Sequence, residues 1–315
     1  ITTAENTSFG HEHRFCEIKN YADFKERVQL CNYENLRPYV ERIASGEHGV
    51  LWPGRPEYFA KTSGTTSGAK YIPLTREGLM CQIKATRNML LRYILATGNV
   101  GFVGGKMIFL QGSPVLNDKN GIKTGRLSGI VAHHIPFYLQ SNRKPTFETN
   151  CIEDWEEKVE AIVDETAGAD MTLISGIPSW LQMYFERLTA RTGKKIGELF
   201  PHFSLLVTGG VNFSPYRARL ESMIGRKVDV LETYPASEGF IAASDSVSGD
   251  GSLLLMVNSG IFYEFVPADR FYEENPPRLS LEEVCTGVNY AIILSTNSGL
   301  WAYAIGDTVE FTSLR

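Results

Sequence analysis

The second half of the sequence alternates strand-like and helix-like segments, and this order limits the possible folds more than any other feature. Apolar runs at 171–175, 203–208 and 227–232 have the length of buried strands. Helix-like segments at 178–192 and 215–224 separate them, and each begins with proline and is followed by glycine. Such an order predicts three parallel strands joined by right-handed crossovers. The expected fold class is therefore α/β.

Ligands of parallel sheets bind beyond the carboxyl ends of the strands. In this sequence those ends are Ser175-Gly176, the Thr-Gly-Gly of 208–210 and the segment TYPASEG at 233–239. Three candidate loops should therefore meet at one edge of the sheet. Ser175 is not expected to be a nucleophile, because the G-x-S-x-G frame of a nucleophile elbow is absent around it.

The first half contains one long amphipathic helix, expected from about Arg76 to Thr97. Thr75 supplies an N-cap, and Gly98 follows the helix end. An extended run at 57–64 precedes this helix. The buried stripe of the helix is expected to consist of four apolar residues, Leu79, Ile83, Leu90 and Ile94.

Four apolar runs, separated by turn residues and without helix signals, close the sequence. They predict an antiparallel or β-barrel-like subdomain and lie at 252–257, 261–266, 289–294 and 300–305. We expect α/β sheets and helices over about 1–245, and the mainly antiparallel β subdomain over 246–315.

Composition favours small-molecule chemistry. The formal net charge is −5 with Lys and Arg scattered, so no nucleic-acid or anionic membrane surface is expected. No apolar run approaches the ~18 residues that span a bilayer, and the first residues lack a signal peptide. Five cysteines without a C-x-x-C pattern indicate a reducing, cytoplasmic setting. His11, His13 and Cys16 match no zinc spacing and are expected in a polar loop.

The segment SGTTSGAK, residues 63–70, has the composition of a phosphate-binding loop. Its glycines, hydroxyls and Lys70 follow an expected strand, and backbone N–H groups with hydroxyls can surround phosphate oxygens. It is not a P-loop, because three residues rather than four separate Gly64 from Gly68, and Tyr71 follows the lysine. By itself, a polar turn explains the segment equally well.

Two further motifs place carboxylates at strand ends. In Tyr234-Pro-Ala-Ser237-Glu238, a ring can cover a flat base and a carboxylate can hold a hard cation through oxygen. In Gly306-Asp307, the carboxylate can accept both hydrogen bonds of a ribose diol. Each motif alone is more simply a solvated loop or a turn. All three in one chain are far less expected by chance.

Together these motifs give the sequence a family resemblance. The segments 63–70, 208–210, 234–239 and 299–311 resemble, in order and spacing, the plant auxin-responsive acyl acid amido synthetases and their bacterial relatives. That family belongs to the acyl-adenylate-forming superfamily, with acyl-CoA synthetases and luciferases. The resemblance covers nearly the whole chain. It implies the large amino-terminal domain of this fold type; the family's small carboxy-terminal lid domain is expected to be missing from these 315 residues.

The resemblance implies that ATP and Mg²⁺ are the cofactors and assigns the phosphates to the first motif. Ser63, Gly64, Thr65 and Thr66 would contact the ATP phosphates. Lys70 would be catalytic, offsetting charge that develops on the departing pyrophosphate.

The other nucleotide contacts come from the later motifs. The resemblance implies that Gly209 and Gly210 line the adenine slot and that Tyr234 stacks on the base. It implies that Ser237 and Glu238 complete the signature, with Glu238 as the magnesium ligand and a catalytic residue. It further implies that Asp307 binds the ribose hydroxyls.

The sequence defines the substrates only as a small-molecule carboxylic acid and an amine or amino acid acceptor. The family's third motif usually carries an arginine where Ala302 stands between Trp301 and Tyr303. Arg87 flanks the expected helix stripe, where it could meet a second carboxylate of the acid or simply extend into solvent. A thioester-forming acyl-CoA ligase and a non-catalytic nucleotide-binding module remain alternatives. The sequence does not indicate the oligomeric state.

Overall fold

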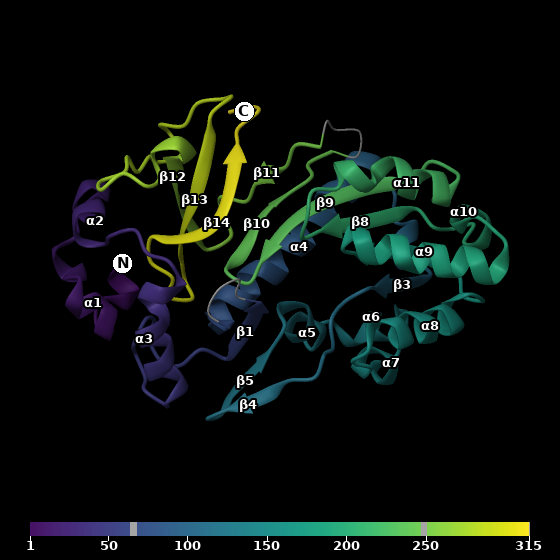
Figure 1. Ribbon diagram of the computed structural model, residues 1–315, viewed down its shortest axis with the longest axis horizontal. Helices are drawn as coiled ribbons and strands as arrows, with labels where there is room; N and C mark the ends of the chain where they lie inside the picture. Colours follow the sequence, from purple (N-terminus) through teal and green to yellow (C-terminus); the bar gives the residue numbers. More distant parts are fainter. Residues whose placement is uncertain (64–67, 247–250, 315) are drawn as a thin grey trace.

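The computed structural model describes residues 1–63, 68–246 and 251–314, and its largest element is a seven-stranded sheet (Figure 1). The strand order is β11-β10-β9-β8-β7-β3-β6. The strands from β6 to β9 are parallel, whereas β10 and β11 are antiparallel additions. Their bounds are β3 Lys106–Phe109, β6 Arg143–Lys144, β7 Met171–Gly176, β8 Leu205–Gly209, β9 Asp229–Ala236, β10 Gly239–Ala243 and β11 Leu254–Leu255. The predicted α/β class and parallel β7–β8–β9 unit are confirmed.

Helices cover both faces of this sheet (Figure 1). Side chains alternate along a strand, so neighbouring residues face opposite sides. Ile174 and Leu206 pack with the helices α8 to α11, whereas Leu173 and Leu205 pack with α4. The covering helices are α4 Arg76–Thr97, α8 Trp155–Thr166, α9 Pro178–Thr192, α10 Ile196–Leu199 and α11 Ser214–Ile224.

Helix α11 begins one residue earlier than its proline signal suggests. Ser214, the residue before that proline, is the first helical residue, and Phe213 is the N-cap. The Asn212 side chain accepts the Ser214 N–H at 2.8 Å, which supports this earlier start.

The long helix α4 has the predicted ends, including the Thr75 cap and Gly98 in the left-handed region. Its buried face differs from the prediction beyond Leu79. The predicted residues Ile83, Leu90 and Ile94 are only partly buried. The buried line instead passes through Leu79, Gln82, Ala85, Met89 and Tyr93. Packing against the sheet selects this line, and it includes two polar-ended side chains that an apolar stripe cannot predict.

The segment SGTTSGAK spans the end of one strand and the beginning of the next in a β-hairpin. Strand β1, Tyr58–Ser63, pairs antiparallel with β2, Ala69–Leu74, with Thr62 opposite Lys70. Strand β2 was not predicted, because Pro73 within a short run argues against a strand. Proline is tolerated here because β2 is the edge of a sheet ordered β2-β1-β5-β4. The remaining strands are β4 Asn117–Lys119 and β5 Ile122–Gly125.

The carboxy-terminal strands form a separate antiparallel sheet in the order β12-β13-β14, as the apolar runs predicted. The bounds are β12 Ile261–Pro267, β13 Asn289–Thr296 and β14 Tyr303–Glu310. The run 252–257 behaves differently, because its strand β11 extends the large sheet. Strand β14 begins three residues later than its apolar run, since Ala302 has φ +45°, outside the β region.

The amino-terminal segment predicted as a polar loop is helical. His11 lies in α1, Ser8–Glu12, and Cys16 lies in the 3₁₀ helix η2, Phe15–Glu17. Thr7 caps α1 by accepting the Gly10 N–H, and burial of Phe9 and Phe15 anchors both turns. Within the described ranges no group of three His, Cys, Asp or Glu side chains is placed to bind a metal ion.

A buried ion pair joins the amino-terminal helices to the carboxy-terminal sheet. Arg278 donates from Nε and Nη2 to the two carboxylate oxygens of Glu264 on β12, both at 2.8 Å. Tyr21 at the start of α2 donates to the same carboxylate at 2.9 Å.

The other helices are α2 Tyr21–Arg27, α3 Tyr33–Ala44, α5 Leu127–Ala132, α6 Phe137–Gln140, α7 Phe147–Cys151, η1 Thr2–Ala4, η3 Gly101–Val103 and η4 Ala268–Arg270. None of the helices in the described ranges is both long and apolar enough to cross a membrane.

Candidate nucleotide and acyl-activation site

The carboxyl edge of the large sheet carries a tight turn, Ser237-Glu238, between β9 and β10. Strand β9 continues four residues beyond the predicted strand end, so Tyr234 lies within the strand rather than in a loop. Its backbone pairs with Ala242 on β10. The backbone pairing of β9 with β10 therefore fixes the position of Tyr234, whereas Glu238 lies in the turn between these two strands.

Tyr234 and Asp307 connect the second and third motifs. The Tyr234 hydroxyl donates a hydrogen bond to the Asp307 carboxylate, which lies on β14 of the smaller sheet. Burial raises the pKa of Tyr234, and the Asp307 carboxylate raises it further, so the hydroxyl keeps its proton as a donor. The structure thus brings together two residues that the sequence assigned to the base and the ribose.

Glu238 lies in a partly buried position between charged groups of the other motifs. Burial raises the pKa of Glu238 to about 7, while Lys70 acts to lower it and Asp307 to raise it. Charged residues of both other motifs therefore affect the pKa of the Glu238 carboxylate. Lys70, Glu238 and Asp307, one from each motif, therefore lie near one another, and their roles in binding and catalysis stay predictions.

Lys70 is held at this site by strand β2 and by an aromatic neighbour. Its Nζ lies 5.8 Å from the centre of the Tyr33 ring, within cation–π range. The Tyr33 hydroxyl accepts the backbone N–H of Tyr71 at 2.8 Å, which fixes helix α3 against β2. Tyr33 therefore restrains the lysine from a segment that the sequence did not connect with the site.

Tyr303 is a second residue that sequence reasoning did not assign. It is 1% exposed, begins β14 and pairs with Cys31. Burial raises the pKa of Tyr303, with a further contribution from Glu238. The position of Tyr303 within the third motif could have identified it from the sequence. Nothing in the sequence around Tyr33 indicated that it lies at this site.

The two predicted adenine-slot glycines are required by close packing and by backbone conformation. A Cβ at Gly209 would lie 2.3 Å from Thr233 Oγ1 and 2.5 Å from the Thr233 carbonyl oxygen. Gly210 has φ +86°, a conformation that glycine adopts without strain. The chain can therefore turn at the end of β8 directly beside β9.

The remaining predicted residues have different outcomes. Gly64, Thr65 and Thr66 lie outside the described residues. Ser63 ends β1, and its backbone pairs with Ala69. Arg87 is exposed on α4, away from the buried line of that helix. Its role in acid binding stays a prediction without support from a neighbouring site residue.

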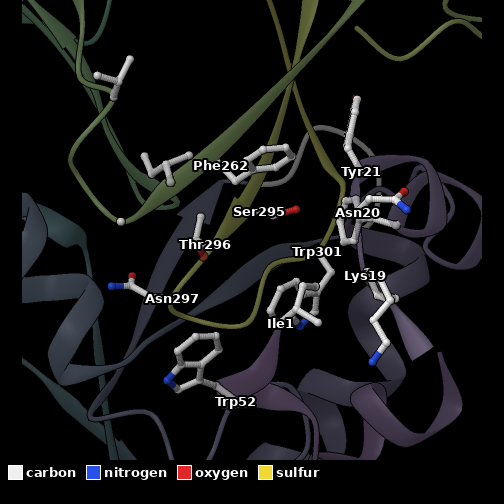
Figure 2. A pocket seen from close by; sticks show the side chains of 15 residues that line it. Ile1, Lys19, Asn20, Tyr21, Trp52, Phe262, Ser295, Thr296, Asn297 and Trp301 are labelled. Carbon is white, nitrogen blue, oxygen red and sulfur yellow. The ribbon is translucent and has the colours of Figure 1, made fainter. Parts of the chain in front are cut away.

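A cavity lies elsewhere, between the amino-terminal segment and the β12–β14 sheet. It has a volume of about 600 Å³, and Figure 2 shows Trp52, Trp301 and Phe262 on its walls. None of the described site residues named above lines it. The ring of Trp301 faces this cavity, while the strand that follows leads to Asp307. The cavity is therefore separate from the convergence of the three motifs.

The fold is that of acyl-adenylate-forming enzymes. The chain matches the structure of the GH3.15 acyl acid amido synthetase in complex with 2,4-DB, with a TM-score of 0.77 at 18% identity over 99% of this chain and 63% of that chain. It also matches 2-hydroxyisobutyryl-CoA ligase in complex with 2-HIB-AMP and CoA, with a TM-score of 0.63 at 14% identity over 98% and 61%. Both likenesses concern the fold.

Sequence comparison defines the family within this class. Residues 1–151 match the model of the GH3 family N-terminal domain, and residues 254–315 match that of the GH3 family central domain. The chain belongs to the GH3 family.

Named relatives extend over most of the chain. A jasmonoyl–L-amino acid synthetase of Nicotiana attenuata is 22% identical over 91% of this chain and 60% of its own length. The indole-3-acetic acid-amido synthetase GH3.15 of Arabidopsis thaliana is 24% identical over 92% and 60%. The chain thus spans about three fifths of the length of these relatives.

Proposed function

We propose that this chain binds ATP with Mg²⁺ at the carboxyl edge of the large sheet and activates a carboxylic acid as an acyl-adenylate. The acyl group then passes to an amine, most simply that of an amino acid. The observation that carries this proposal is the convergence of Lys70, Tyr234, Glu238 and Asp307, which come from three separate motifs. Membership of the GH3 family supports the same activity.

A carboxylate is a poor electrophile, so amide formation requires a leaving group on its carbon. The carboxylate oxygen attacks the α-phosphorus of ATP, and pyrophosphate departs with its electron pair. The amine then attacks the acyl carbon, and AMP leaves with the oxygen that bridged carbon and phosphorus. The protein mainly has to align the reactants and stabilise the charge that moves to the pyrophosphate.

The chain's own side chains suit these tasks. The Tyr234 ring covers the adenine, and Asp307 accepts hydrogen bonds from the ribose hydroxyls. Lys70 places a positive charge near the departing pyrophosphate, and Tyr33 limits its movement. Ser63, Gly64, Thr65 and Thr66 of the hairpin segment supply donors for the phosphates.

The carboxylate of Glu238 fits a magnesium ion by its chemistry. Mg²⁺ prefers oxygen ligands and commonly uses one or two carboxylates together with substrate phosphates. In the described part of the chain no cluster of three acidic, His or Cys side chains surrounds Glu238, so phosphate oxygens and water would complete the ligand set. When bound, the ion would supply electrostatic stabilisation of the pyrophosphate.

The relatives favour acid–amine ligation. Their names specify jasmonoyl–amino acid and indole-3-acetic acid-amido synthetases, which join an acid to an amine. The alternative is an acyl-CoA ligase, favoured by the fold shared with 2-hydroxyisobutyryl-CoA ligase. We place the reaction in the reducing cytoplasm, consistent with five free cysteines.

The activation step is tested by carboxylate-dependent exchange of labelled pyrophosphate into ATP. The full-length protein is assayed with aromatic, indolic and aliphatic acids. Exchange that depends on one class of acid supports the proposal. Binding of magnesium-ATP without exchange for any acid would instead support a non-catalytic nucleotide-binding module.

A separate measurement distinguishes the two acceptors. AMP release is followed with the preferred acid in the presence of either a panel of amino acids or coenzyme A. Stimulation by an amino acid supports amide formation, whereas stimulation by coenzyme A alone would identify a thioester-forming ligase.

A further inference from the structure

The cavity beside the amino-terminal segment has the size of a small-molecule site. Its volume of about 600 Å³ lies within the roughly 300–1,000 Å³ that such sites usually have. Five aromatic side chains line it, namely Tyr21, Phe24, Trp52, Phe262 and Trp301. Aromatic walls are common in pockets that bind organic ligands. The described residues assigned to ATP do not line it, so a ligand of this cavity would be a second molecule.

Phe262 forms one wall of the cavity and Trp52 the opposite wall (Figure 2). Phe262 lies on β12 and remains 47% exposed, although its side chain is large and apolar. Tyr21 and Phe24 of α2 contact this ring at steep angles, with ring centres 5.7 and 6.2 Å away. These contacts hold Phe262 in place and leave about half of it open to a ligand.

The opposite wall is a preformed pair of indole rings. Trp52 and Trp301 are stacked, with 29° between the ring planes and 5.9 Å between the ring centres. Trp301 donates from Nε1 to the Leu51 carbonyl oxygen at 3.1 Å and is 4% exposed, so its ring is fixed. Aromatic rings pair best when they are offset-stacked or edge to face, with centres roughly 4.5–7 Å apart. A flat ligand between Phe262 and Trp52 can form such pairs with both walls.

The charge around the cavity favours an anion over a cation. Among the described side chains that line it, Lys19 alone is charged. Its Nζ donates to the Cys16 carbonyl oxygen at 2.9 Å, and an ammonium group has two further N–H donors. The hydroxyl of Ser295, another lining residue, already accepts the Ala302 N–H at 2.8 Å. A ligand would therefore bind mainly through its rings, with one negative group directed toward Lys19.

We propose that this cavity is a second binding site, for a planar aromatic molecule of one or two fused rings that carries one negative charge. The rings lie between Phe262 and Trp52, and the charged group meets the exposed Lys19. Binding requires neither ATP nor Mg²⁺, because the cavity shares no described residue with the nucleotide motifs. The inference goes beyond the proposed acyl activation and stands independently of it.

The tryptophans of the chain provide both a reporter and an internal control. Of the four, Trp52 and Trp301 line the cavity, whereas Trp155 and Trp180 pack together on α8 and α9 with ring centres 4.2 Å apart. The full-length protein is labelled with ¹⁵N in its tryptophan indoles, and the signals are assigned by single substitution of each tryptophan by phenylalanine. Naphthalene-2-sulfonate is the probe, because a sulfonate cannot serve as a carboxylic acid substrate. Its addition without nucleotide should shift the Trp52 and Trp301 signals and leave those of Trp155 and Trp180 unchanged.

Two variants separate the contribution of the rings from that of the charge. Phe262→Ala should weaken binding of naphthalene-2-sulfonate and of uncharged 2-naphthol by about 3- to 10-fold, because one aromatic wall is lost. Lys19→Gln should weaken only binding of the sulfonate, by about 2- to 5-fold, as expected for an exposed ion pair. The matched controls are Tyr272→Ala, an aromatic residue 93% exposed outside the cavity, and Lys194→Gln, an exposed lysine after α9. Neither control should change the Kd of either probe.

Three results would overturn the inference. The first is the absence of any shift at Trp52 and Trp301 up to the solubility limit of both probes. The second is an unchanged Kd in Phe262→Ala, in a protein whose other indole signals show that the fold is intact. The third is an unchanged Kd for the sulfonate in Lys19→Gln, because the negative charge would then have no partner at the cavity.

Asp307→Ala distinguishes this cavity from the nucleotide site. Binding of naphthalene-2-sulfonate should be unaffected by this change, since Asp307 does not line the cavity. A Kd raised as much as in Phe262→Ala would place the probe at the nucleotide site and refute the inference. Pyrophosphate exchange tests the proposed function separately, so failure of one proposal does not entail failure of the other.

Discussion

At the scale of single residues, the hydrogen bond between Tyr234 and Asp307 joins positions 73 residues apart. Both side chains were assigned to ATP from sequence motifs, but the sequence could not show that they contact each other. The contact orients the Asp307 carboxylate before a nucleotide binds. One carboxylate oxygen accepts the Tyr234 hydroxyl, so the other oxygen is the one that would accept from the ribose in the proposed complex.

Replacement of Asp307 by alanine should therefore mainly weaken nucleotide affinity. We expect a loss of about 1–3 kcal/mol in magnesium-ATP binding by calorimetry, because a charged hydrogen-bond acceptor is removed. Tyr234→Phe should cost less, since it retains the ring. The matched control is Glu310→Ala, an exposed carboxylate on the same strand. Unchanged ATP affinity in Asp307→Ala would refute the ribose assignment.

Glu238→Ala should affect the reaction more than the binding of the nucleotide. We expect acid-dependent pyrophosphate exchange to fall by about 10²- to 10³-fold, as for other losses of electrostatic stabilisation. ATP binding measured without magnesium should change little. Glu221→Ala, an exposed change on α11, provides the control. Exchange at the wild-type rate in Glu238→Ala would exclude this residue as the metal ligand.

At the scale of elements, the path of the chain at the site depends on the close approach of β8 and β9. The parallel pairing of these strands was readable from the alternation of apolar runs and punctuated helices. The hairpin of β1 and β2 was not, because β2 is short, contains Pro73 and is defined by its partner strand. Likewise, β11 pairs with β10 of the large sheet rather than with the smaller sheet. This pairing depends on long-range packing and could not be predicted from the apolar run alone.

Gly209→Ala should destabilise the fold at this contact. The added Cβ would lie 2.3 Å from Thr233 Oγ1, so β8 or β9 must shift. We expect a loss of about 1–3 kcal/mol in the free energy of unfolding, measured in urea. Gly168→Ala is the control, because a Cβ there meets no atom within 4 Å. Equal stability of the two variants would contradict the close-packing argument.

At the scale of the whole molecule, residues from both ends of the sequence enclose the site. Lys70 from the hairpin and Asp307 from the last strand lie near Glu238, and Tyr33 from the amino-terminal helices lies against Lys70. The motifs identified most of this set, since backbone turns and charged groups leave sequence signals. Tyr33 was not identified, because its position against Lys70 depends on how helix α3 packs on strand β2.

The buried Arg278–Glu264 pair should be important for this arrangement. Arg278→Met leaves the Glu264 carboxylate in an interior position where it is fully buried, and we expect a loss of about 3–5 kcal/mol in unfolding free energy. The double variant Arg278→Met/Glu264→Leu should recover part of this loss, because no charge is left unpaired. Arg270→Ala, in an exposed pair, should change stability little. A harmless Arg278→Met variant would show that the pair is not required.

The central claim is that a carboxylate oxygen of the substrate attacks the α-phosphorus of ATP at this site. The most direct measurement supplies the full-length protein with an acid labelled with ¹⁸O in its carboxylate, together with ATP and an amine acceptor, and determines the mass of the nucleotide product. The account predicts AMP that carries one ¹⁸O atom. Formation of ADP with the label in inorganic phosphate, or unlabelled AMP, would contradict it.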